Sequence, residues 1–338
     1  MSRKTVLLLF GGQSPEHDVS IMSARNVYAA MDNEKYHVLL GYIDSHGKWW
    51  MMKSWNDDLS QHGGKQLVAV PGMGSFVTYP GSDVVHVDVI FPVLHGENGE
   101  DGSIQGLAKL LHIPVVGCGV AASAVCMDKV LAKQILCGKD IMVTPWVELR
   151  RGDAIDKILI ERELGNDIFV KPVSGGSSVG VSHVTDFSEL ESACEKAWKY
   201  SDGLLLEKTI YGRELEVAVL GENNHAKASD VGEIVSSDDK FYDYDEKYTD
   251  NSSARINTEA DLPNEIRESI RDSALTIYRT LGCSGMARVD FLYDGETVYF
   301  NEVNTIPGFT SVSMYPKLWQ AEGVKYPELI DKLIKFAV

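Results

Sequence analysis

Hydrophobic runs and amphipathic stretches alternate along the first third of the chain. Residues 5–10 are a continuous apolar run that ends in Gly11-Gly12, which predicts a buried parallel strand leading into a loop. Helical spacing follows at 20–31 and 106–111, and further strand-like runs at 36–43, 87–94 and 113–116. This alternation predicts an α/β unit with a parallel sheet. Ligands of such sheets bind beyond the carboxyl ends of the strands, which here are residues 11–20 and 95–102.

The rest of the chain continues with short elements. A helical pattern runs without interruption over residues 121–137. The strand-like runs 168–171 and 181–184 flank a glycine-rich turn, so they predict an antiparallel hairpin and not the strand-to-helix turn of a P-loop. Other predicted elements are strands at 203–207, 214–220 and 228–234 and helices at 190–199, 265–281 and 327–336. Residues 49–81 have no clear period, and we interpret them as a hairpin insertion at the surface.

Residues 286–316 carry polar groups suited to a metal. Asp290, Glu302 and Asn304 fall on two strand-like runs around a turn at Asp294-Gly295. Mg²⁺ prefers oxygen ligands and is usually held by one or two carboxylates together with substrate phosphates. The segment therefore predicts a nucleotide as well as a metal. A hairpin whose acids merely face water would have the same composition.

The length of the hairpin loop decides whether these side chains can share a metal. A two-residue turn would pair Tyr293 with Glu296 and place Asp290 on the opposite face from Glu302, because side chains alternate along a strand. We therefore expect a loop of three or five residues. One face of the hairpin would then carry Arg288, Asp290, Leu292, Phe300, Glu302 and Asn304.

Composition narrows the classes of function. The chain has 338 residues, 44% of them hydrophobic, enough for two or three packed domains. Its net charge of −17 argues against nucleic acid or an anionic membrane as a partner, though not against a phosphate ligand held by local donors. The five cysteines include no CxxC pair and are expected to be reduced thiols in a cytosolic protein. Residues 1–12 have too short an apolar run for a signal peptide or a membrane span.

Four further positions each allow two interpretations. Lys171 before the glycine-rich residues 175–180 fits a phosphate cradle, or an ordinary hairpin with a surface lysine. Glu16 and His95, each after a predicted strand, fit a substrate pocket, or solvated strand ends. Lys129 fits a phosphate contact, or a surface lysine on a helix.

A long polar segment, residues 236–253, has no predicted secondary structure. It contains the sequence FYDYDEKY, whose tyrosines and lysine are unusual for a passive linker. Long structureless loops in compact domains are often functional lids, so we predict a lid here. Ser178 in GSSVG lies between two strands and does not match the strand–turn–helix setting of a hydrolase nucleophile.

Together these residues resemble the D-alanine–D-alanine ligases of the ATP-grasp superfamily over essentially the whole chain. The motifs that carry the resemblance, in family order, are FGGQSPEHDVS (10–20), LHGENGEDGSIQGL (94–107), CMDK (126–129), VKPVSGGSSVG (170–180), LLLEK (204–208), GRELEVAVLG (212–221), FYDYDEKY (241–248) and ARVDFLYD…FNEVNTIPGFTSVSMYP (287–316). Eight motifs in one order are far more specific than any one of them. They favour the functional interpretation at each position above.

The resemblance implies an α/β ATP-grasp fold of three α/β domains, with nucleotide held between the central and C-terminal ones. The expected domains are an N-terminal substrate domain (1–120), a central ATP-grasp domain (121–206) and a C-terminal ATP-grasp domain (207–338) that holds the metal site and the mobile loop 236–253. In this family the carboxylate of one D-alanine attacks the γ-phosphate of ATP. The amino group of a second D-alanine then displaces phosphate from the acyl phosphate. The implied product is D-alanyl-D-alanine for peptidoglycan.

The resemblance also implies roles for ATP, for two Mg²⁺ ions (or Mn²⁺) and for the residues that meet them. The implied ATP-binding residues are Lys129, Lys171 and Lys247 at the phosphates, Ser178 on the closing loop, and Glu207 and Glu214 at the ribose or adenine edge. Asp290, Glu302 and Asn304 would bind the two metal ions, which neutralise charge on the transferring phosphoryl group.

The two D-alanine molecules have implied partners of their own. Glu16 would pair with the ammonium group of the first, and His95 would help to hold its carboxylate side. Ser313 and the N–H of Met314 would take the carboxylate of the second.

The implied catalytic groups surround the reacting atoms. Arg288 and the N–H of Gly308 would stabilise the acyl phosphate and the later oxyanion. Tyr248 would link Glu16 and Ser177 in a hydrogen-bond network that closes the lid and excludes water.

Two positions bear on the second substrate. Related resistance ligases that use D-lactate carry a histidine where this chain has Lys247-Tyr248, and several resistance ligases carry arginine at the position of Met314. Both positions therefore point to D-alanine. The alternatives are a D-alanine–D-serine or D-alanine–D-lactate ligase, another ATP-grasp carboxylate–amine ligase, and a non-catalytic regulator, which would lack Lys171, Arg288 or a metal acid. The family also implies a cytoplasmic homodimer without nucleic acid or membrane partners.

Overall fold

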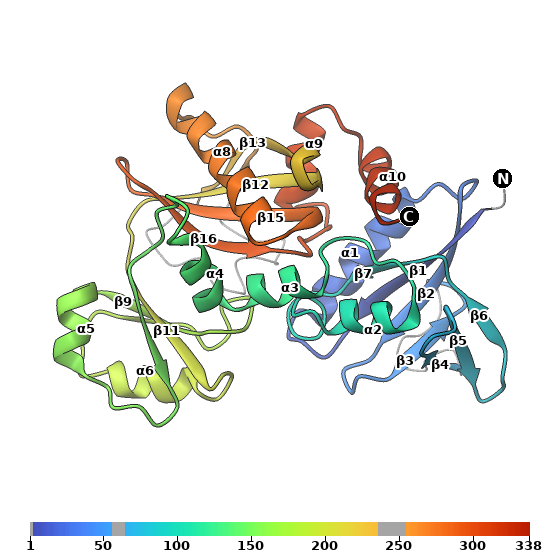
Figure 1. The fold of residues 1–338 in the computed structure, drawn as a ribbon, viewed down its shortest axis with the longest axis horizontal. Helices are drawn as coiled ribbons and strands as arrows, with labels where there is room; N and C mark the ends of the chain where they lie inside the picture. Colours follow the sequence, from blue (N-terminus) through green and yellow to red (C-terminus); the bar gives the residue numbers. More distant parts are fainter. Residues whose placement is uncertain (1–2, 56–64, 236–254) are drawn as a thin grey trace.

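The computed structural model describes residues 3–55, 65–235 and 255–338. Within these ranges the chain forms three β-sheets with helices packed around them, and the five-stranded sheet lies between the other two in Figure 1. The predicted α/β architecture is confirmed. Every helix in this part of the chain is too short or too polar to cross a bilayer.

The first sheet has seven strands in the order β6-β5-β4-β3-β2-β1-β7. The bounds are β1 (Lys4–Gly11), β2 (Tyr36–Ile43), β3 (Trp49–Met52), β4 (Lys65–Val70), β5 (Ser75–Tyr79), β6 (Val84–His86) and β7 (Val89–Val93). β1 pairs in parallel with β2 and β7, as predicted. The remaining pairs are antiparallel, so the described part of residues 49–81 adds strands at one edge of this sheet, where β4 and β5 form a hairpin.

The apolar run of β1 is explained by burial on both faces. Leu8 and Phe10 pack in one hydrophobic core with α1 (His17–Ala30), while Leu7 and Leu9 pack in another with α2 (Ser103–Leu111). All four side chains have no exposed surface. A strand covered on both faces has no position for a polar residue, which is why the run is continuous.

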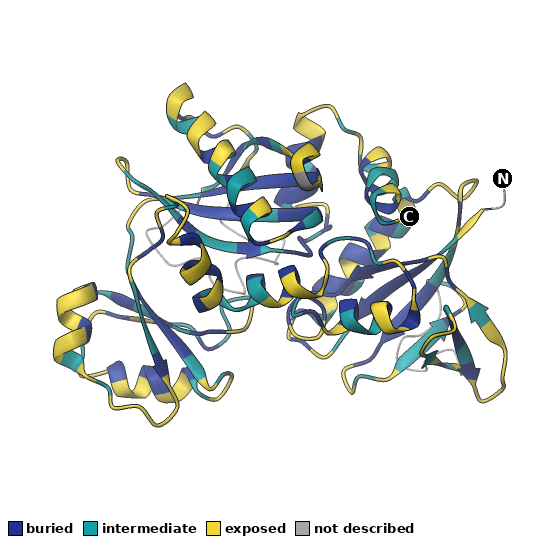
Figure 2. Cartoon of the chain, in the orientation of Figure 1, coloured by how far each residue is buried: buried dark blue, intermediate teal, exposed yellow. Residues whose placement is uncertain are grey.

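The second sheet has four antiparallel strands in the order β10-β9-β11-β8. They are β8 (Trp146–Arg150), β9 (Ile168–Pro172), β10 (Ser182–Val184) and β11 (Gly203–Lys208). The predicted hairpin around the glycine-rich turn is confirmed as β9 and β10. α5 (Lys157–Leu164) and α6 (Leu190–Ala197) cover one face, and their outer sides are exposed (Figure 2).

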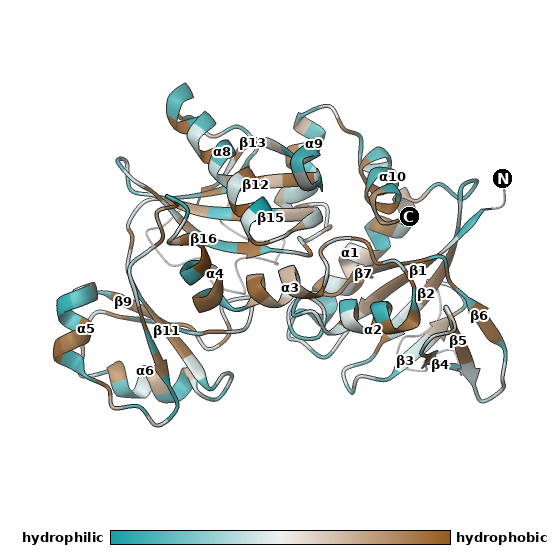
Figure 3. Ribbon diagram, viewed as in Figure 1, coloured by the Kyte–Doolittle hydropathy of each residue, from teal (hydrophilic) through white to brown (hydrophobic). Residues whose placement is uncertain are grey.

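The third sheet is antiparallel, with the order β14-β13-β12-β15-β16. Its strands are β12 (Arg213–Glu222), β13 (Lys227–Val235), β14 (Arg255–Asn257), β15 (Ser284–Tyr293) and β16 (Val298–Asn304). Val289 and Phe291 of β15 face a core covered by α8 (Asn264–Thr280). The residues that alternate with them, such as Asp290, therefore point to the opposite face. Figure 3 shows the hydrophilic residues of α8 interrupted by the hydrophobic ones that pack on the sheet.

The predicted helix over residues 121–137 is two helices, α3 (Val120–Met127) and α4 (Lys129–Leu136). Asp128 separates them with an extended backbone at ψ 100°, and its carboxylate accepts a hydrogen bond from the N–H of Leu131 at 2.9 Å. The prediction of one helix was wrong because Asp128 is an N-cap, a position where the side chain satisfies an otherwise unpaired amide.

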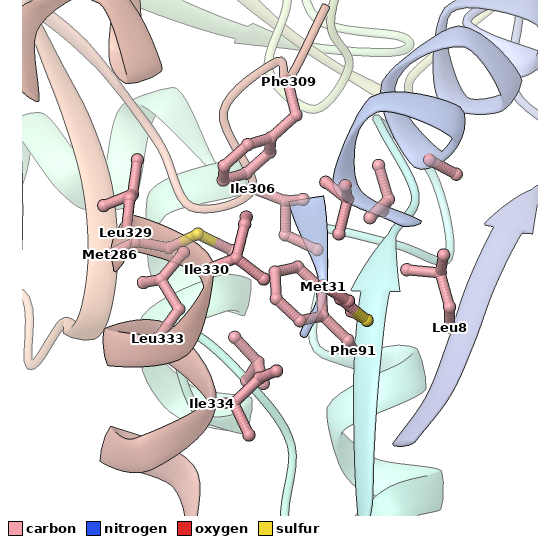
Figure 4. Close-up of a cluster of buried hydrophobic side chains, with 14 of the residues drawn as sticks. Leu8, Met31, Phe91, Met286, Ile306, Phe309, Leu329, Ile330, Leu333 and Ile334 are labelled. Atoms are coloured by element: carbon pink, nitrogen blue, oxygen red, sulfur yellow. The ribbon is translucent and has the colours of Figure 1, made fainter. Parts of the chain in front are cut away.

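The chain closes with α9 (Met314–Ala321) and α10 (Tyr326–Ala337). α10 packs against the first sheet, so the first and third sheets share one hydrophobic core. Figure 4 shows this core: Leu333 and Ile334 of α10 lie near Phe91 of β7, and Met286 of β15 joins the same cluster. The first and third sheets are thereby held as one packed body.

Candidate active site

One pocket is lined by residues from all three sheets and their loops. The lining includes fourteen of the predicted site residues: Glu16, His95, Lys129, Lys171, Ser177, Ser178, Glu214, Arg288, Asp290, Glu302, Asn304, Gly308, Ser313 and Met314. Glu207 is buried beside Lys171, one layer behind the pocket wall. Lys247 and Tyr248, with the predicted lid, lie outside the described residues.

The floor of the pocket is the face of the third sheet that α8 does not cover. Glu216, Asp290 and Glu302 are direct neighbours across β12, β15 and β16. Arg288 and Asn304 form the next row on the same face. Because strand alternation sends the apolar residues to α8, the polar ones of the same strands collect in the pocket.

The hairpin brings Asp290 opposite Glu302 in a way that differs from the prediction. Tyr293 pairs with Val298, so the loop has four residues, 294–297, and the expected three- or five-residue loop was wrong. A β-bulge at Asn301 shifts the register by one residue and restores the pairing. Phe300 consequently pairs with Phe291 in the core under α8, and its predicted place on the polar face was also wrong.

Asp290 is held by two neighbours on the floor. The guanidinium of Arg288 donates to both of its carboxylate oxygens, at 2.8 and 2.7 Å, and the amide of Asn304 donates to one of them at 2.9 Å. Arg288 also lies 3.2 Å from a carboxylate oxygen of Glu216. Lys129, at the first position of α4, lies 3.6 Å from Glu302. Each carboxylate that could bind a metal is therefore close to a cation.

The N-terminal side of the pocket presents Glu16 and His95. The Glu16 carboxylate is buried, and a Cβ on Gly96 or on Gly176 would come within 3.1 Å of it. Glycine at both positions lets the loop after β7 and the glycine-rich turn approach the same carboxylate.

His95 supports the backbone that follows β16. Its Nδ1 lies 3.0 Å from the carbonyl oxygen of Ile306, and since a carbonyl only accepts, Nδ1 carries the proton. Its Nε2 lies 3.4 Å from the hydroxyl of Ser23, which also accepts from the N–H of Phe309. Burial lowers the pKa of the His95 imidazole. Both ring nitrogens are thus engaged in holding residues 306–309.

Glu100 is a lining residue that the sequence did not single out, although it lies in a quoted motif. Its carboxylate accepts from the N–H of Gly96 at 2.8 Å and of Ile306 at 3.0 Å. Burial and the nearby charge of Glu16 raise the pKa of Glu100 to about 8. The sequence signal for Glu100 was an acidic residue four positions after Gly96, at the end of a predicted strand. Glu216 was missed as well, two residues after Glu214 on the same strand face.

The glycine-rich turn reaches the pocket in a strained conformation. Ser177 and Ser178 have φ values of 51° and 58°, a region that non-glycine residues rarely adopt. The Ser177 hydroxyl is buried and has no hydrogen-bond partner among the described residues. Lys129 fixes the start of the turn, because its ammonium group donates to the carbonyl of Gly175 at 2.7 Å.

The segment after β16 closes the far end of the pocket. A Cβ on Gly308 would come within 2.7 Å of the Ser313 hydroxyl, so this close approach requires glycine. The Ser313 hydroxyl accepts from the N–H of Thr310 at 2.9 Å. Met314 begins α9 and is 3% exposed, with its thioether packed against Gly232 of β13. Met314 thus lines the pocket at the start of α9 while its side chain packs into the hydrophobic core.

The pocket lining has more acidic than basic side chains, which favours a ligand that carries cations. Among the described lining residues there are six acidic side chains and three permanently charged basic ones: Glu16, Glu100, Glu214, Glu216, Asp290 and Glu302 against Lys129, Lys171 and Arg288. The pKa of Glu100 is raised, but the acids outnumber the cations even without it. In this part of the chain no group of three or more His, Cys, Asp or Glu side chains forms a ready metal centre. The pair Asp290 and Glu302, with the amide of Asn304, fits a Mg²⁺ site completed by ligand phosphates.

Two family models match the chain. A family model described as the D-ala D-ala ligase N-terminus matches residues 5–118, and one described as the D-ala D-ala ligase C-terminus matches residues 135–335. The D-alanine–D-alanine ligase A of Chromobacterium violaceum is 46% identical over 354 aligned residues, which cover 100% of this chain and 96% of that protein.

Two solved structures have the same architecture. The VanG D-Ala:D-Ser ligase from Enterococcus faecalis is 36% identical with a TM-score of 0.89, and the match covers 100% of both chains. The D-alanine–D-alanine ligase from Bacillus anthracis complexed with ATP is 28% identical with a TM-score of 0.75, over 99% of this chain and 97% of that one. The fold is that of an ATP-grasp protein. Within that class, the chain belongs to the D-alanine–D-alanine ligase family.

Proposed function

We propose that this protein joins two D-alanine molecules to D-alanyl-D-alanine for peptidoglycan synthesis, with ATP cleaved to ADP and phosphate through a D-alanyl phosphate. The observation that carries the proposal is the meeting of Glu16, the glycine-rich turn and the Arg288–Asp290 floor in one pocket of a family member. The pocket thus offers a site for an ammonium group next to a site for phosphates.

The phosphate end of the pocket is the group around the glycine-rich turn. Lys129 and Lys171 supply positive charge, and Ser177 and Ser178 lie on the turn that would cover the phosphates. Glu214 would meet the ribose or adenine edge. Glu207, which was predicted to join it there, is buried behind Lys171 and would act through that lysine. Lys247, outside the described residues, would reach the γ-phosphate. An ATP-complexed family structure supports ATP as the nucleotide.

Asp290, Glu302 and Asn304 would hold two Mg²⁺ ions, which supply positive charge at the transferring phosphoryl group. The excess of carboxylates over cations in the lining supports this, because a polyphosphate without metal would meet net negative charge. Arg288 is the residue on the floor that would turn from Asp290 toward the acyl phosphate once a metal neutralises the carboxylate.

The substrate end holds the first D-alanine by its ammonium group at Glu16. His95 would orient the segment that contacts its carboxylate side. The N–H of Gly308, with Arg288, would stabilise the oxyanion formed when the second amino group attacks. Ser313 and the N–H of Met314 would bind the second carboxylate, at the start of α9, where unpaired amides favour an anion.

Tyr248 would join Glu16 and Ser177 when the lid is closed. The buried Ser177 hydroxyl without a described partner supports such a contact. Closing the network would exclude water from the acyl phosphate.

A second candidate function is D-alanine–D-serine ligation, favoured by the similarity to the VanG ligase. The Met314 side chain carries no polar group that could pair with a serine hydroxyl, which supports D-alanine instead.

The test is phosphate release with ATP, Mg²⁺ and D-alanine as the only amino acid, with L-alanine as the control and mass spectrometry of the product. D-serine and D-lactate then compete with D-alanine between about pH 6 and 9. A product dominated by D-alanyl-D-serine or by a depsipeptide would contradict the proposed second substrate. No phosphate release with D-alanine alone would favour another ATP-grasp ligase.

We also propose that the chain is divided into domains 1–120, 121–206 and 207–338 and acts as a homodimer in the cytoplasm, where its co-substrate ATP is made. Light scattering after gel filtration tests the dimer, and a mass equal to one chain would contradict it.

A further inference from the structure

A second lysine on α4 is completely buried behind the pocket. Lys133 follows Lys129 by one helical turn and has no exposed surface. Its ammonium group lies 6.0 Å from the ring centre of Trp146 and 5.9 Å from that of Phe300. Lysine is rarely buried unless it is paired, so this side chain needs a specific explanation. It does not line the pocket and has no place in the proposed chemistry.

Lys133 shares one carboxylate with Lys171. Its ammonium group lies 2.6 Å from Oε1 of Glu207, while the ammonium of Lys171 lies 2.5 Å from Oε2. Thr144 completes the group: its hydroxyl accepts from Lys133 and donates to Oε1 of Glu207 at 2.5 Å. The four side chains come from α4, the loop before β8, β9 and β11. Of the four, only Lys171 reaches the pocket.

The charge of this group depends on Lys133. Two ammonium groups and one carboxylate give a net charge of +1, and without Lys133 the pair that remains is neutral. When an anion draws Lys171 toward the pocket, Lys133 and Thr144 still satisfy Oε1 of Glu207. Without Lys133, the same movement would leave a buried carboxylate with no counter-charge, which is strongly unfavourable.

We infer that Lys133 is a positioning residue for nucleotide binding: as a fixed internal counter-charge for Glu207, it frees the ammonium group of Lys171 to hold a polyphosphate chain. The inference rests on the proposed function for the identity of the polyphosphate as ATP. It concerns binding, because Lys133 acts only through Glu207 and Lys171.

The experiment measures binding of inorganic tripolyphosphate in the presence of Mg²⁺ by calorimetry, since this probe has no ribose or base and reports only on the phosphate end of the pocket. We expect Lys133→Met to weaken binding about tenfold or more. Lys133→Gln, which keeps a hydrogen-bonding side chain without the charge, should weaken it similarly. Lys139→Met removes an exposed lysine just beyond α4 and should bind as the wild type does.

A double variant separates charge from folding. In Lys133→Met/Glu207→Gln the net charge at Lys171 returns to +1, so tripolyphosphate binding should recover most of the loss. A purely structural role for Lys133 predicts no recovery. If Lys133→Met does not fold, the double variant still tests the idea, because it removes the buried carboxylate together with its counter-charge and should bind close to wild type.

Kinetics give an independent readout. In Lys133→Met the KM for ATP should rise by about the same factor while kcat changes little. Wild-type protein that does not bind tripolyphosphate, a Lys133→Met variant that binds it normally, or a double variant without recovery would each overturn the inference. If the wild type ligates D-alanine but the expected binding results are not obtained, the proposed function is kept and the role of Lys133 is rejected. If the binding results hold but D-alanine is not ligated, the role of Lys133 stands and the proposed substrate is wrong.

Discussion

The first and third sheets are joined by a large apolar core, whereas the four-stranded sheet meets the rest of the molecule through charged contacts and one small apolar cluster. The joined core runs from β1 and β7 to α9, α10 and β12. The four-stranded sheet has a separate core of its own, with Leu206 at its centre, and a small cluster around Val130 and Val173 links it to α4. The first and third sheets therefore form one packed body, and the four-stranded sheet is a second body with a core of its own.

This difference explains where the charged residues lie. The contacts that cross to the four-stranded sheet include Lys129 with Gly175 and Lys133 with Glu207. Charged contacts tolerate exchange with a ligand better than close-packed apolar ones, because a bound anion or cation can replace the lost partner. Substitutions at the pocket should therefore change activity, and substitutions in the joined core should change stability.

The largest effect is expected for Glu302→Gln at the pocket. Loss of this carboxylate should lower kcat by roughly 10³-fold, the scale of a lost electrostatic contact to the transition state. The thermal unfolding midpoint should stay close to that of the wild type, because the Glu302 side chain is 30% exposed. Glu296→Gln in the exposed turn of the same hairpin is the matched control. Near-normal turnover of Glu302→Gln would refute the metal role.

Core truncations should distinguish the two bodies. Leu333→Ala in α10 and Leu206→Ala in β11 each remove a fully buried side chain and should each lower the free energy of unfolding by about 2–5 kcal/mol. Hydrogen exchange should then increase in both the first and third sheets for Leu333→Ala, but mainly in residues 146–208 for Leu206→Ala. Equal increases throughout the molecule in both variants would contradict the division into two bodies.

Glu100 should make stability depend on pH where the first and third sheets meet. Its pKa is raised to about 8 from 4.5, so the folded state binds a proton that the unfolded state has lost. The stabilisation is complete below about pH 4.5 and is lost as pH rises through about 8. The free energy of unfolding of Glu100→Gln relative to wild type should therefore increase over this range. A difference that stays constant with pH would show that folding does not raise the pKa of Glu100.

The smallest effect is expected for Lys65→Ala at the edge of the first sheet. Lys65 pairs with Asp83 at 2.5 Å, but both side chains are largely exposed. Such pairs are screened by solvent and rarely contribute measurably. Neither the unfolding midpoint nor kcat should change, and a clear loss of stability would mean that this edge contributes to the joined core.

The elements with strong periodicity could be predicted from the sequence. The continuous run of β1 and the alternation of β12 and β15 follow from burial, which the residue types record directly. The helix α9 was missed because Pro316 lies inside it and its apolar face is short. The break at Asp128 was missed because one capping aspartate does not interrupt an apolar pattern.

The site could be predicted as a set of residues but not as a geometry. The motifs indicated fourteen residues that line the pocket, since their chemistry is visible in the sequence. The pairing of His95 with Ile306 and the sharing of Glu207 by two lysines depend on contacts between distant segments. The sequence signal for Lys133 is a charged residue among the apolar positions of a helix.

The bulge at Asn301 makes the face on which Glu302 lies independent of the length of the hairpin loop. Since the bulge sets which face Glu302 occupies, the length of the turn at 294–297 is free to vary, by odd or even numbers of residues, without moving the carboxylates. The turn is thus a permissive point for insertions, suited to carrying a peptide tag or a fluorescent label. Deletion of Asn301, by contrast, would remove the bulge, turn the Glu302 side chain away from the pocket and abolish activity.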